Sequence, residues 1–471
     1  MTPSAYQFGG FLFYVLNNAG ETVNGALRTG TSFPAVSNLS AFLKKTSARH
    51  LLAVSAEKEI RLNGDTVYRL RQLAADTLAG IVYSDYFIEQ EGRLSYRQLV
   101  DYQQGSIRDD FHFGDVLLFS PAAVESVLSK YGRLPADEYC ALYDLRLKIS
   151  IEYPIIHAPE ALYTVVERKE KQDGKGRIVP EPHFAYTAAK NQSRQKILEK
   201  AATNYLKLIG AHLKARTKKP PTDKVHYPVT ASVIIPVLNR KKTIAAAINS
   251  ALDQKTDFNF NIVVVNNHST DGTGKVIEKL ASSHPEIKHL VPSRFDLSIG
   301  GCWNEAIYSS SCGKYAVQLD SDDLYSSPRT LQNIVDVLKK GNYAMVIGSY
   351  TLVNERLETM PPGLIDHREW TNANGHNNAL RINGLGAPRA FNTSVLRRIG
   401  FPNVGYGEDY AVALRITREY KIGRIYDSLY LCRRWPDNTD AALTMEKQNR
   451  HDYYKDKLRT LEIAARKLMN K

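Results

Sequence analysis

Three apolar runs, each followed by a cluster of polar side chains, constrain the fold of this chain more than any other feature. The runs are ASVIIPVLN (231–239), FNIVVV (260–265) and KYAVQL (314–319), and the clusters are NRKK, NNHSTDGT and DSDD. Continuous β-branched runs are typical of strands that are buried on both faces, and a helix pattern lies between the first two runs. Strand, helix and strand in this order predict a parallel α/β unit whose ligand crevice lies at the carboxyl ends of the strands.

Length, charge and cysteine content narrow the class of protein. The 471 residues favour about two or three domains. Lys and Arg number 62 against 49 Asp and Glu, so the net charge of +13 makes a polyanion the expected type of partner. The four cysteines lack CxxC spacing, which favours buried thiols in a reducing compartment over a zinc site or disulfides. No run of about 18 apolar residues occurs, and the N-terminus lacks signal-peptide features, so we expect a soluble intracellular protein.

The order of segments in the first half of the chain is similar to the order in the second half. Residues 49–74 resemble 314–335 in sequence character, and DEY (137–139) resembles EDY (408–410). Collinear similarity of this kind predicts an internal duplication. Chance similarity between α/β segments is the alternative interpretation.

The DSDD tetrad follows the third apolar run and precedes a helix pattern. Asp320 and Asp322 are placed so that both carboxylates can converge on one hard cation, which diphosphate oxygens also bind. Such a cation would neutralise charge on a diphosphate leaving group. The alternative is a helix N-cap cluster, because Asp is common before helices.

Two other polar clusters border the same predicted edge. Glu408 and Asp409 open a predicted helix, where a carboxylate can act as a general base toward an acceptor hydroxyl or simply cap the helix. The turn at 266–273 offers amides and a carboxylate that can bind a nucleobase or ribose edge, or form an ordinary capped turn.

The motifs IIPVLNR, NNHSTDGT, DSDD and GEDY occur in this order at predicted strand ends, and residues from about 230 to 434 resemble an inverting family 2 glycosyltransferase of GT-A fold. The resemblance implies an α/β fold with a mixed, mostly parallel sheet. It also implies a nucleotide-sugar donor, with UDP favoured, and Mn²⁺ or Mg²⁺ as cofactor. An acceptor hydroxyl would displace the nucleoside diphosphate directly, so no protein nucleophile is needed.

The resemblance also implies roles for individual residues. Those implied to bind the nucleotide sugar are Pro236, Asn239, Asn267, Asp271, Arg294, Asn304 and Asp320. Those implied at the metal are Asp322 and Asp323, and the implied general base is Asp409, with Glu408 beside it as the second candidate. Two departures from the family pattern stand out: Asn266-Asn267 replace an acidic pair, and Trp303 replaces an arginine whose charge Arg294 would supply. An asparagine still has the donor and acceptor needed to pair with a pyrimidine edge.

With this resemblance the chain divides into four expected parts. They are a degenerate GT-A-like domain (1–166), a helical linker (167–227), a catalytic GT-A domain (228–440) and a C-terminal basic helix (441–471). In the first part SAEKE (55–59) stands where the second part has DSDD, so the carboxylate pair is lost and stability, acceptor binding or assembly is the expected role. A second active site, as in two-domain glycan polymerases, is the alternative.

We therefore expect a metal-dependent hexosyl- or N-acetylhexosaminyltransferase that acts on a glycan or lipid-linked acceptor in cell-surface glycan synthesis, in the cytoplasm. A nucleotide-sugar-binding scaffold without catalysis is the competing class. A nucleotidyltransferase is disfavoured because PVLNRKK contains no glycine for a phosphate loop. Nucleic acid is not an expected partner, since only basicity favours it. The basic C-terminal helix can contact an anionic membrane or pack on a domain, and its similarity to the helix at 187–216 favours packing.

Overall fold

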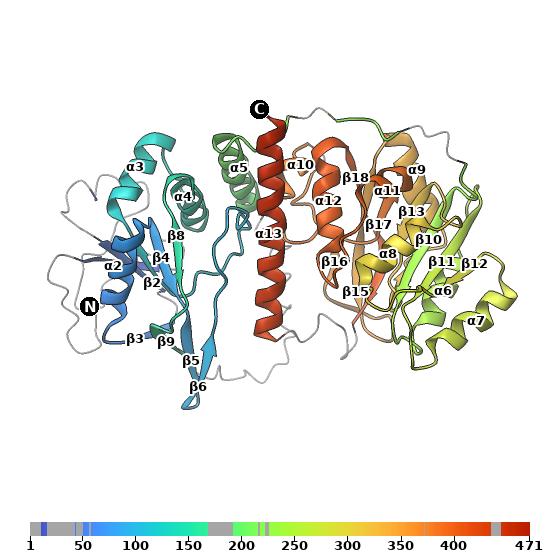
Figure 1. Ribbon diagram of the computed structural model, residues 1–471, viewed down its shortest axis with the longest axis horizontal. Helices are drawn as coiled ribbons and strands as arrows, with labels where there is room; N and C mark the ends of the chain where they lie inside the picture. The colour runs from blue at the N-terminus through green and yellow to red at the C-terminus, as the bar shows by residue number, and fades with distance from the viewer. Residues whose placement is uncertain are drawn as a thin grey trace. The chain divides into compact units, whose positions relative to one another are not determined.

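The chain folds into two compact units in the computed structural model, which describes residues 11–16, 43, 50–55, 58–167, 192–214, 217–221, 226–371, 373–434 and 444–471 (Figure 1). The first unit contains the described residues up to 167 together with Ser193–His212 and Thr444–Lys471. The second unit contains the described residues between Leu213 and Leu443. The helix of the expected linker and the expected C-terminal helix thus both contribute to the first unit.

A nine-stranded mixed sheet forms the centre of the second unit. Its strands are β10 (Ala231–Val237), β11 (Phe260–Asn266), β12 (Ile287–Leu290), β13 (Tyr315–Gln318), β14 (Leu324–Tyr325), β15 (Met345–Val353), β16 (Thr359–Ile365), β17 (Arg389–Asn392) and β18 (Ile422–Arg433). They are ordered β12-β11-β10-β13-β17-β15-β18-β14, and β16 pairs with β15. The pairs among β10, β11, β12 and β13 are parallel, which confirms the predicted parallel α/β unit.

Helices pack against this sheet. They are α6 (Ile244–Leu252), α7 (Thr273–Ser283), α8 (Ile299–Tyr308), α9 (Thr330–Gly341) and α11 (Thr393–Ile399), whereas α10 (Gly375–Asn378) and α12 (Glu408–Glu419) contact other helices. Ile235 of β10 and Val264 of β11 are fully buried, and burial of such a side chain contributes about 1.5–3 kcal/mol. Because a register shift would expose these side chains, the core fixes the pairing of the strands. This register places Val237 beside Asn266, so the polar turns that follow β10 and β11 start next to each other.

Two sheets form the first unit, a five-stranded sheet ordered β1-β2-β7-β4-β8 and a four-stranded sheet ordered β3-β9-β5-β6. The strands are β1 (Phe11–Leu16), β2 (His50–Ser55), β3 (Glu59–Leu62), β4 (Ile81–Ser84), β5 (Tyr86–Gln90), β6 (Arg93–Arg97), β7 (Val116–Phe119), β8 (Ile155–Ala158) and β9 (Tyr163–Glu167). The helices are α2 (Thr66–Thr77), α3 (Pro121–Tyr131), α4 (Glu138–Glu152), α5 (Gln192–Leu208) and α13 (Met445–Met469). No helix in the described parts of either unit is long and apolar enough to cross a bilayer.

The two units share one strand order. In the first unit β2, β7, β4 and β8 are neighbours in this order, as β13, β17, β15 and β18 are in the second. The directions agree as well: β4 is parallel to β8 and antiparallel to β7, while β15 is parallel to β18 and antiparallel to β17. The order β3-β9-β5-β6 likewise corresponds to β14-β18-β15-β16. This agreement supports the internal duplication that the sequence predicts.

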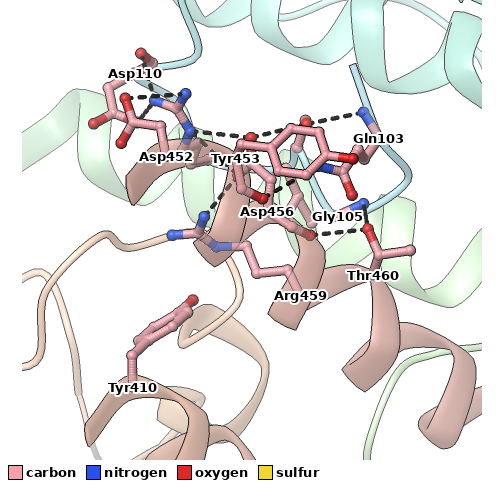
Figure 2. Close-up of polar contacts among 12 residues, drawn as sticks. Gln103, Gly105, Asp110, Tyr410, Asp452, Tyr453, Asp456, Arg459 and Thr460 are labelled. Carbon is pink, nitrogen blue, oxygen red and sulfur yellow. Dashed lines mark hydrogen bonds and ion pairs between the residues drawn. The ribbon is translucent and has the colours of Figure 1, made fainter. Parts of the chain in front are cut away.

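A buried ion-pair cluster fastens α13 to the first unit (Figure 2). Asp456 is fully buried, and its Oδ1 lies 3.2 Å from Arg108 Nε and 2.7 Å from Arg459 Nη1. The Gly105 backbone N–H donates to Thr460 Oγ1 at 2.9 Å. The loop between β6 and β7 therefore holds α13 through both charge and hydrogen bonds.

Replacing Asp456 with Ala should destabilise the first unit selectively. The change leaves Arg108 and Arg459 buried without their shared counter-charge, which lowers the free energy of unfolding by about 3–5 kcal/mol. All three tryptophans lie between residues 213 and 443, so their fluorescence reports the second unit, whereas circular dichroism reports both units. Denaturant unfolding should therefore shift by circular dichroism and not by tryptophan fluorescence.

The matched control is Asp110→Ala, because Asp110 also pairs with Arg108, at 3.0 Å, but has 55% of its side chain exposed. Exposed pairs contribute about 0–1 kcal/mol, so this variant should resemble the wild type. Equal destabilisation by both substitutions would contradict the importance of the buried cluster.

Candidate functional site

The turns that follow β10 and β11 are joined to each other and to the DSDD tetrad. The Asn239 backbone N–H donates to Ser269 Oγ at 2.9 Å, and the Thr270 N–H donates to Asn239 Oδ1 at 2.8 Å. Arg240 Nε lies 3.5 Å from Asp322 Oδ2. Three polar clusters that are far apart in the sequence therefore meet at one edge of the sheet.

Asp271 fastens the turn after β11. Its Oδ1 accepts the Thr273 backbone N–H at 2.9 Å, and its Oδ2 accepts the Lys241 N–H at 3.0 Å. Hydrogen bonds from Thr273 and Lys241 lower the pKa of Asp271. The carboxylate is thus engaged with the backbone of two turns, and it shapes this edge of the sheet.

Asn267 has one buried polar atom without a hydrogen-bond partner among the described residues. Its Nδ2 donates to Leu297 O at 2.8 Å, whereas its buried Oδ1 has no hydrogen-bond partner among the residues that the structure describes. An unsatisfied buried acceptor costs about 1–3 kcal/mol, which a hydrogen-bond donor on a ligand would recover. Pro236 is partly buried near the end of β10, and the residue after it, Val237, pairs with Asn266.

An exposed aromatic pair lies beside the same turn, and it was not expected from the sequence. The Phe295 ring stacks on His268 with 4.0 Å between ring centroids and 18° between planes, and it remains 82% exposed. His268 Nε2 lies 2.9 Å from Arg294 O, which holds the imidazole beneath Phe295. Phe295 stands between two charged residues in a loop, and only the fold brings it to His268.

Two other predicted donor-binding residues have partners within the protein. Arg294 Nη2 pairs with Asp296 Oδ2 at 2.6 Å, and hydrogen bonding to Asp296 raises the pKa of Arg294. Asn304 Nδ2 donates to Phe401 O, and Asn304 Oδ1 accepts the Phe401 N–H, both at 2.8 Å. Asn304 therefore ties α8 to the segment that leads into α12, while Asp296 engages Nε and Nη2 of Arg294.

The carboxylates of the DSDD tetrad crowd together. Asp320 accepts a hydrogen bond from Gln318 Nε2 at 2.9 Å, and Asp323 Oδ1 accepts the Arg433 N–H at 2.7 Å. Burial raises the pKa of Asp320 and of Asp323, and the negative charge of Asp322 raises both further. Asp322 keeps 23% of its side chain exposed. The tetrad thus concentrates negative charge that a cation would stabilise.

This donor set fits a divalent cation through Asp320 and Asp322, since hard cations prefer carboxylate oxygens. Asp323 is 6% exposed and binds a backbone N–H, so it holds the turn. Across the described ranges, no three His, Cys, Asp or Glu side chains are grouped so that they could hold a metal. A cation at this edge would therefore need diphosphate oxygens and water as its remaining ligands.

Arg389 of β17 connects the tetrad to the predicted base, and sequence patterns did not point to it. Its Nε donates to Gln318 Oε1 at 3.0 Å, and its Nη1 pairs with Asp409 Oδ2. The guanidinium also lies in the field of Asp320 and Glu408, and these carboxylates together raise its pKa against the opposing effect of burial. Only the antiparallel pairing of β13 with β17 brings Arg389 to Gln318.

Glu408 and Asp409 occupy different environments at the start of α12. The helix follows Gly407, whose φ of 78° lies in the left-handed region that favours glycine. Burial, and then the neighbouring Asp409 charge, raise the pKa of Glu408 to about 8. Asp409 instead faces Arg389, and its Oδ1 accepts the Tyr410 N–H at 2.6 Å. Of the two, Glu408 therefore retains a proton near neutral pH, and Asp409 is the carboxylate that faces a cation.

The sequence of this region matches one known family, described as Glycosyl transferase family 2, over residues 232–400. These residues form a family 2 glycosyltransferase domain. The family 2 domain contains the turns after β10 and β11, the DSDD tetrad and Arg389.

Several curated proteins are similar to this chain. One is UDP-Glc:alpha-D-GlcNAc-diphosphoundecaprenol beta-1,3-glucosyltransferase WfgD of Escherichia coli, 29% identical over 41% of this chain and 72% of the relative. Putative glycosyltransferase EpsE of Bacillus subtilis is 30% identical over 26% of this chain and 43% of the relative. Among solved structures, S. aureus TarS 1-349 in complex with UDP-GlcNAc is 21% identical, with a TM-score of 0.40, covering 50% of this chain and 66% of that chain.

The first unit has apolar residues where the family 2 domain has Gln318 and Arg389. Arg389 pairs with Ile347 of β15, and the corresponding position of β7 is Leu117, which pairs with Tyr83 of β4. Leu117 also pairs with Ala53 of β2, the position that corresponds to Gln318. Of the SAEKE segment, residues 56 and 57 lie outside the described residues. The polar connection between tetrad and base thus has no counterpart at these two positions.

Replacing Glu408 with Gln should increase the stability of the second unit relative to the wild type, and this gain should grow as the pH rises. In the folded protein Glu408 keeps its proton up to about pH 8, whereas the unfolded chain releases it near the ordinary value of 4.5. Between these values the folded state binds more protons, so the contribution of Glu408 to stability falls with rising pH. The variant should therefore gain on the wild type between pH 5 and pH 8 by on the order of 4 kcal/mol.

Urea unfolding followed by tryptophan fluorescence, in EDTA at both pH values, measures this difference. The control is Glu419→Gln, because hydrogen bonds from Lys218 and Arg415 outweigh partial burial and lower the pKa of Glu419. Because its pKa is lowered, the Glu419 carboxyl group of the folded protein titrates below pH 5. The free energy of unfolding of the control should therefore differ from that of the wild type by the same amount at both pH values. A constant difference for Glu408→Gln as well would contradict the raised pKa.

Proposed function

We propose that the second unit is an inverting, metal-dependent glycosyltransferase that moves a sugar from a UDP-linked donor to a hydroxyl of a glycan or lipid-linked acceptor. The observation that carries this proposal is the connection of Asp320 and Arg389, which lie within the family 2 match, to Asp409, which follows it in the chain. The acceptor class is supported by the named activity of the E. coli relative, whose substrate is a diphosphoundecaprenol-linked sugar. Such synthesis of a cell-surface glycan would use a cytoplasmic donor.

The base of the donor would bind at the turn after β11. Uracil presents one N–H between two carbonyl groups, and the unpartnered Oδ1 of Asn267 is a suitable acceptor for that N–H. The exposed Phe295 ring, backed by His268, offers a flat apolar surface for stacking. Asn239 and Asp271 would keep the two turns in place around the base.

The diphosphate would lie beside the DSDD tetrad. Asp322 and Asp320 would hold Mn²⁺ or Mg²⁺, and the ion would neutralise the negative charge of the departing diphosphate. Arg240, which lies 3.5 Å from Asp322, is a second cation at the same place.

Asp409 would act as the general base. The acceptor hydroxyl gives its proton to Asp409 while its oxygen forms a bond to the anomeric carbon, and the bond from that carbon to the diphosphate oxygen breaks. The electron pair of the broken bond leaves with the nucleoside diphosphate. Arg389 orients Asp409 through the ion pair, and the protonated Glu408 beside it adds no competing charge.

The first unit, in this proposal, is a degenerate copy of the second half of the GT-A fold. It shares the strand order of β13 to β18, but Ala53 and Leu117 stand in place of Gln318 and Arg389. Acceptor binding or assembly is the role that remains for it.

Asp409→Asn and Asp322→Asn should each abolish most of the transfer. Loss of a general base lowers kcat by about 10²–10⁴-fold, and loss of a metal ligand should lower turnover by a comparable factor. Release of UDP from a panel of UDP-sugars with Mn²⁺ and candidate acceptors measures both effects. The matched control is Asp253→Asn at the end of α6, which should retain wild-type turnover. Full activity of the Asp322 variant would refute the proposed metal site.

Phe295→Ala should weaken donor binding without slowing the chemical step. Stacking of a base on an aromatic ring contributes about 1–3 kcal/mol, so KM for the nucleotide sugar should rise roughly 5- to 100-fold while kcat stays within about twofold. Phe295→Trp keeps an aromatic face and should preserve KM. A fall in kcat at unchanged KM would place Phe295 outside the base site.

A further inference from the structure

The outward face of α13 carries a continuous stripe of cations and apolar side chains. Its exposed members lie three or four residues apart and therefore share one face of the helix: Glu446, Arg450, Tyr453, Lys457, Leu461, Ala464 and Leu468, with Lys471 just beyond the helix end at Met469. We call these residues the α13 stripe. Tyr453, Leu461 and Leu468 are 45%, 57% and 70% exposed, so large apolar surface faces solvent along the helix.

Asp452, Asp456 and Glu462 of α13 point away from this stripe, and Glu446 is the acidic residue that shares its face. Asp456 is fully buried against Arg108, and Asp452 lies 3.6 Å from the same guanidinium. Glu462 is buried and pairs with Arg466 at 2.7 Å. Glu446, in the first turn, is the one exposed acidic residue within the described helix. Because Glu446 lies four residues before Arg450 on the same face, the stripe carries three cations and one carboxylate, at its N-terminal end.

Docking of α13 on the first unit does not use the side chains of the stripe. Gln103 Nε2 donates to the backbone oxygen of Tyr453 at 3.2 Å, as Figure 2 shows, and Asn449 Nδ2 donates to Gln98 O at 2.8 Å. At the other end, Asn470 Nδ2 donates to Gly210 O at 2.9 Å. Substitutions in the stripe should therefore leave the first unit folded. Packing within the first unit does not explain why leucines occupy these exposed positions.

We propose that the α13 stripe docks the protein on an anionic membrane surface, with the helix lying along the bilayer plane. Leu461, Leu468 and the Tyr453 ring would enter the interface between headgroups and acyl chains, while the lysines keep their ammonium groups at the lipid phosphates. A 25-residue helix is about 37 Å long, so the stripe offers an extended line of contact.

Charge complementarity favours lipid over a second copy of the chain. Two stripes facing each other would bring together more cations than carboxylates, because each contributes Arg450, Lys457 and Lys471 against Glu446 alone. An anionic bilayer instead attracts each cation and accepts the apolar side chains between them. The docking surface belongs to the first unit and acts without donor or acceptor, so this inference goes beyond the proposed transfer reaction.

Co-sedimentation of the full chain with sucrose-loaded vesicles tests the proposal. With vesicles of phosphatidylcholine and phosphatidylglycerol at 7:3, the wild type should bind at 0.1 M NaCl, and with pure phosphatidylcholine it should bind far less. Lys457→Glu with Lys471→Glu should weaken the partition coefficient at least about thirtyfold. Leu461→Ser with Leu468→Ser should weaken it at both low and high salt, because apolar insertion is not screened.

The matched control is Lys279→Glu with Lys340→Glu on α7 and α9, which changes net charge by the same amount and should retain most of the binding. Equal losses in both charge variants would show attraction by net charge alone and overturn the assignment to the stripe. Absence of binding to the anionic vesicles would overturn it too. So would a dimer, detected by light scattering, that the leucine substitutions convert to a monomer. UDP release in solution, measured on the same variants, tests the proposed transfer independently.

Discussion

The ion pairing of the partly buried Arg389 guanidinium is the interaction on which the proposed site depends. Three carboxylates, Asp320, Glu408 and Asp409, come within its field, from a strand end and from a helix start. Without a cation between them, the negative charges of Asp320 and Asp409 would repel each other in a setting that water screens poorly. The same guanidinium, hydrogen-bonded to Gln318, fixes the position of Asp409 relative to the strand that precedes the tetrad. Structure and proposed chemistry thus rely on one side chain.

The parts of the site that lie next to strand ends could be predicted from the sequence. Apolar runs such as 260–265 identify buried strands, and parallel strands bring the polar turns after them to one edge. Arg389 could not be found in this way, because it lies 71 residues from its partner Gln318 and meets it through antiparallel pairing. Phe295 was missed for a related reason, since its partner His268 belongs to another loop. Local patterns encode strands and turns, whereas contacts between distant loops are set by packing.

The two units show how a shared strand order can hold different side chains. The pairing register aligns Leu117 with Arg389 and Ala53 with Gln318, so a charged connection in one unit corresponds to an apolar one in the other. Such an exchange is compatible with folding, because apolar residues of similar volume can replace a buried ionic network. The first unit keeps its own buried charge cluster elsewhere, between the β6–β7 loop and α13.

The return of α13 to the first unit has a consequence for the order of events during synthesis. Asp456 is translated after the whole second unit, so Arg108 has no buried counter-charge from this helix until then. At about 5–20 residues per second, the delay is on the order of tens of seconds. The family 2 domain can complete its core during this interval, while the first unit waits with an open face. The first unit is therefore translated before the second unit but closed after it, and its open face is accessible to chaperones in the interval.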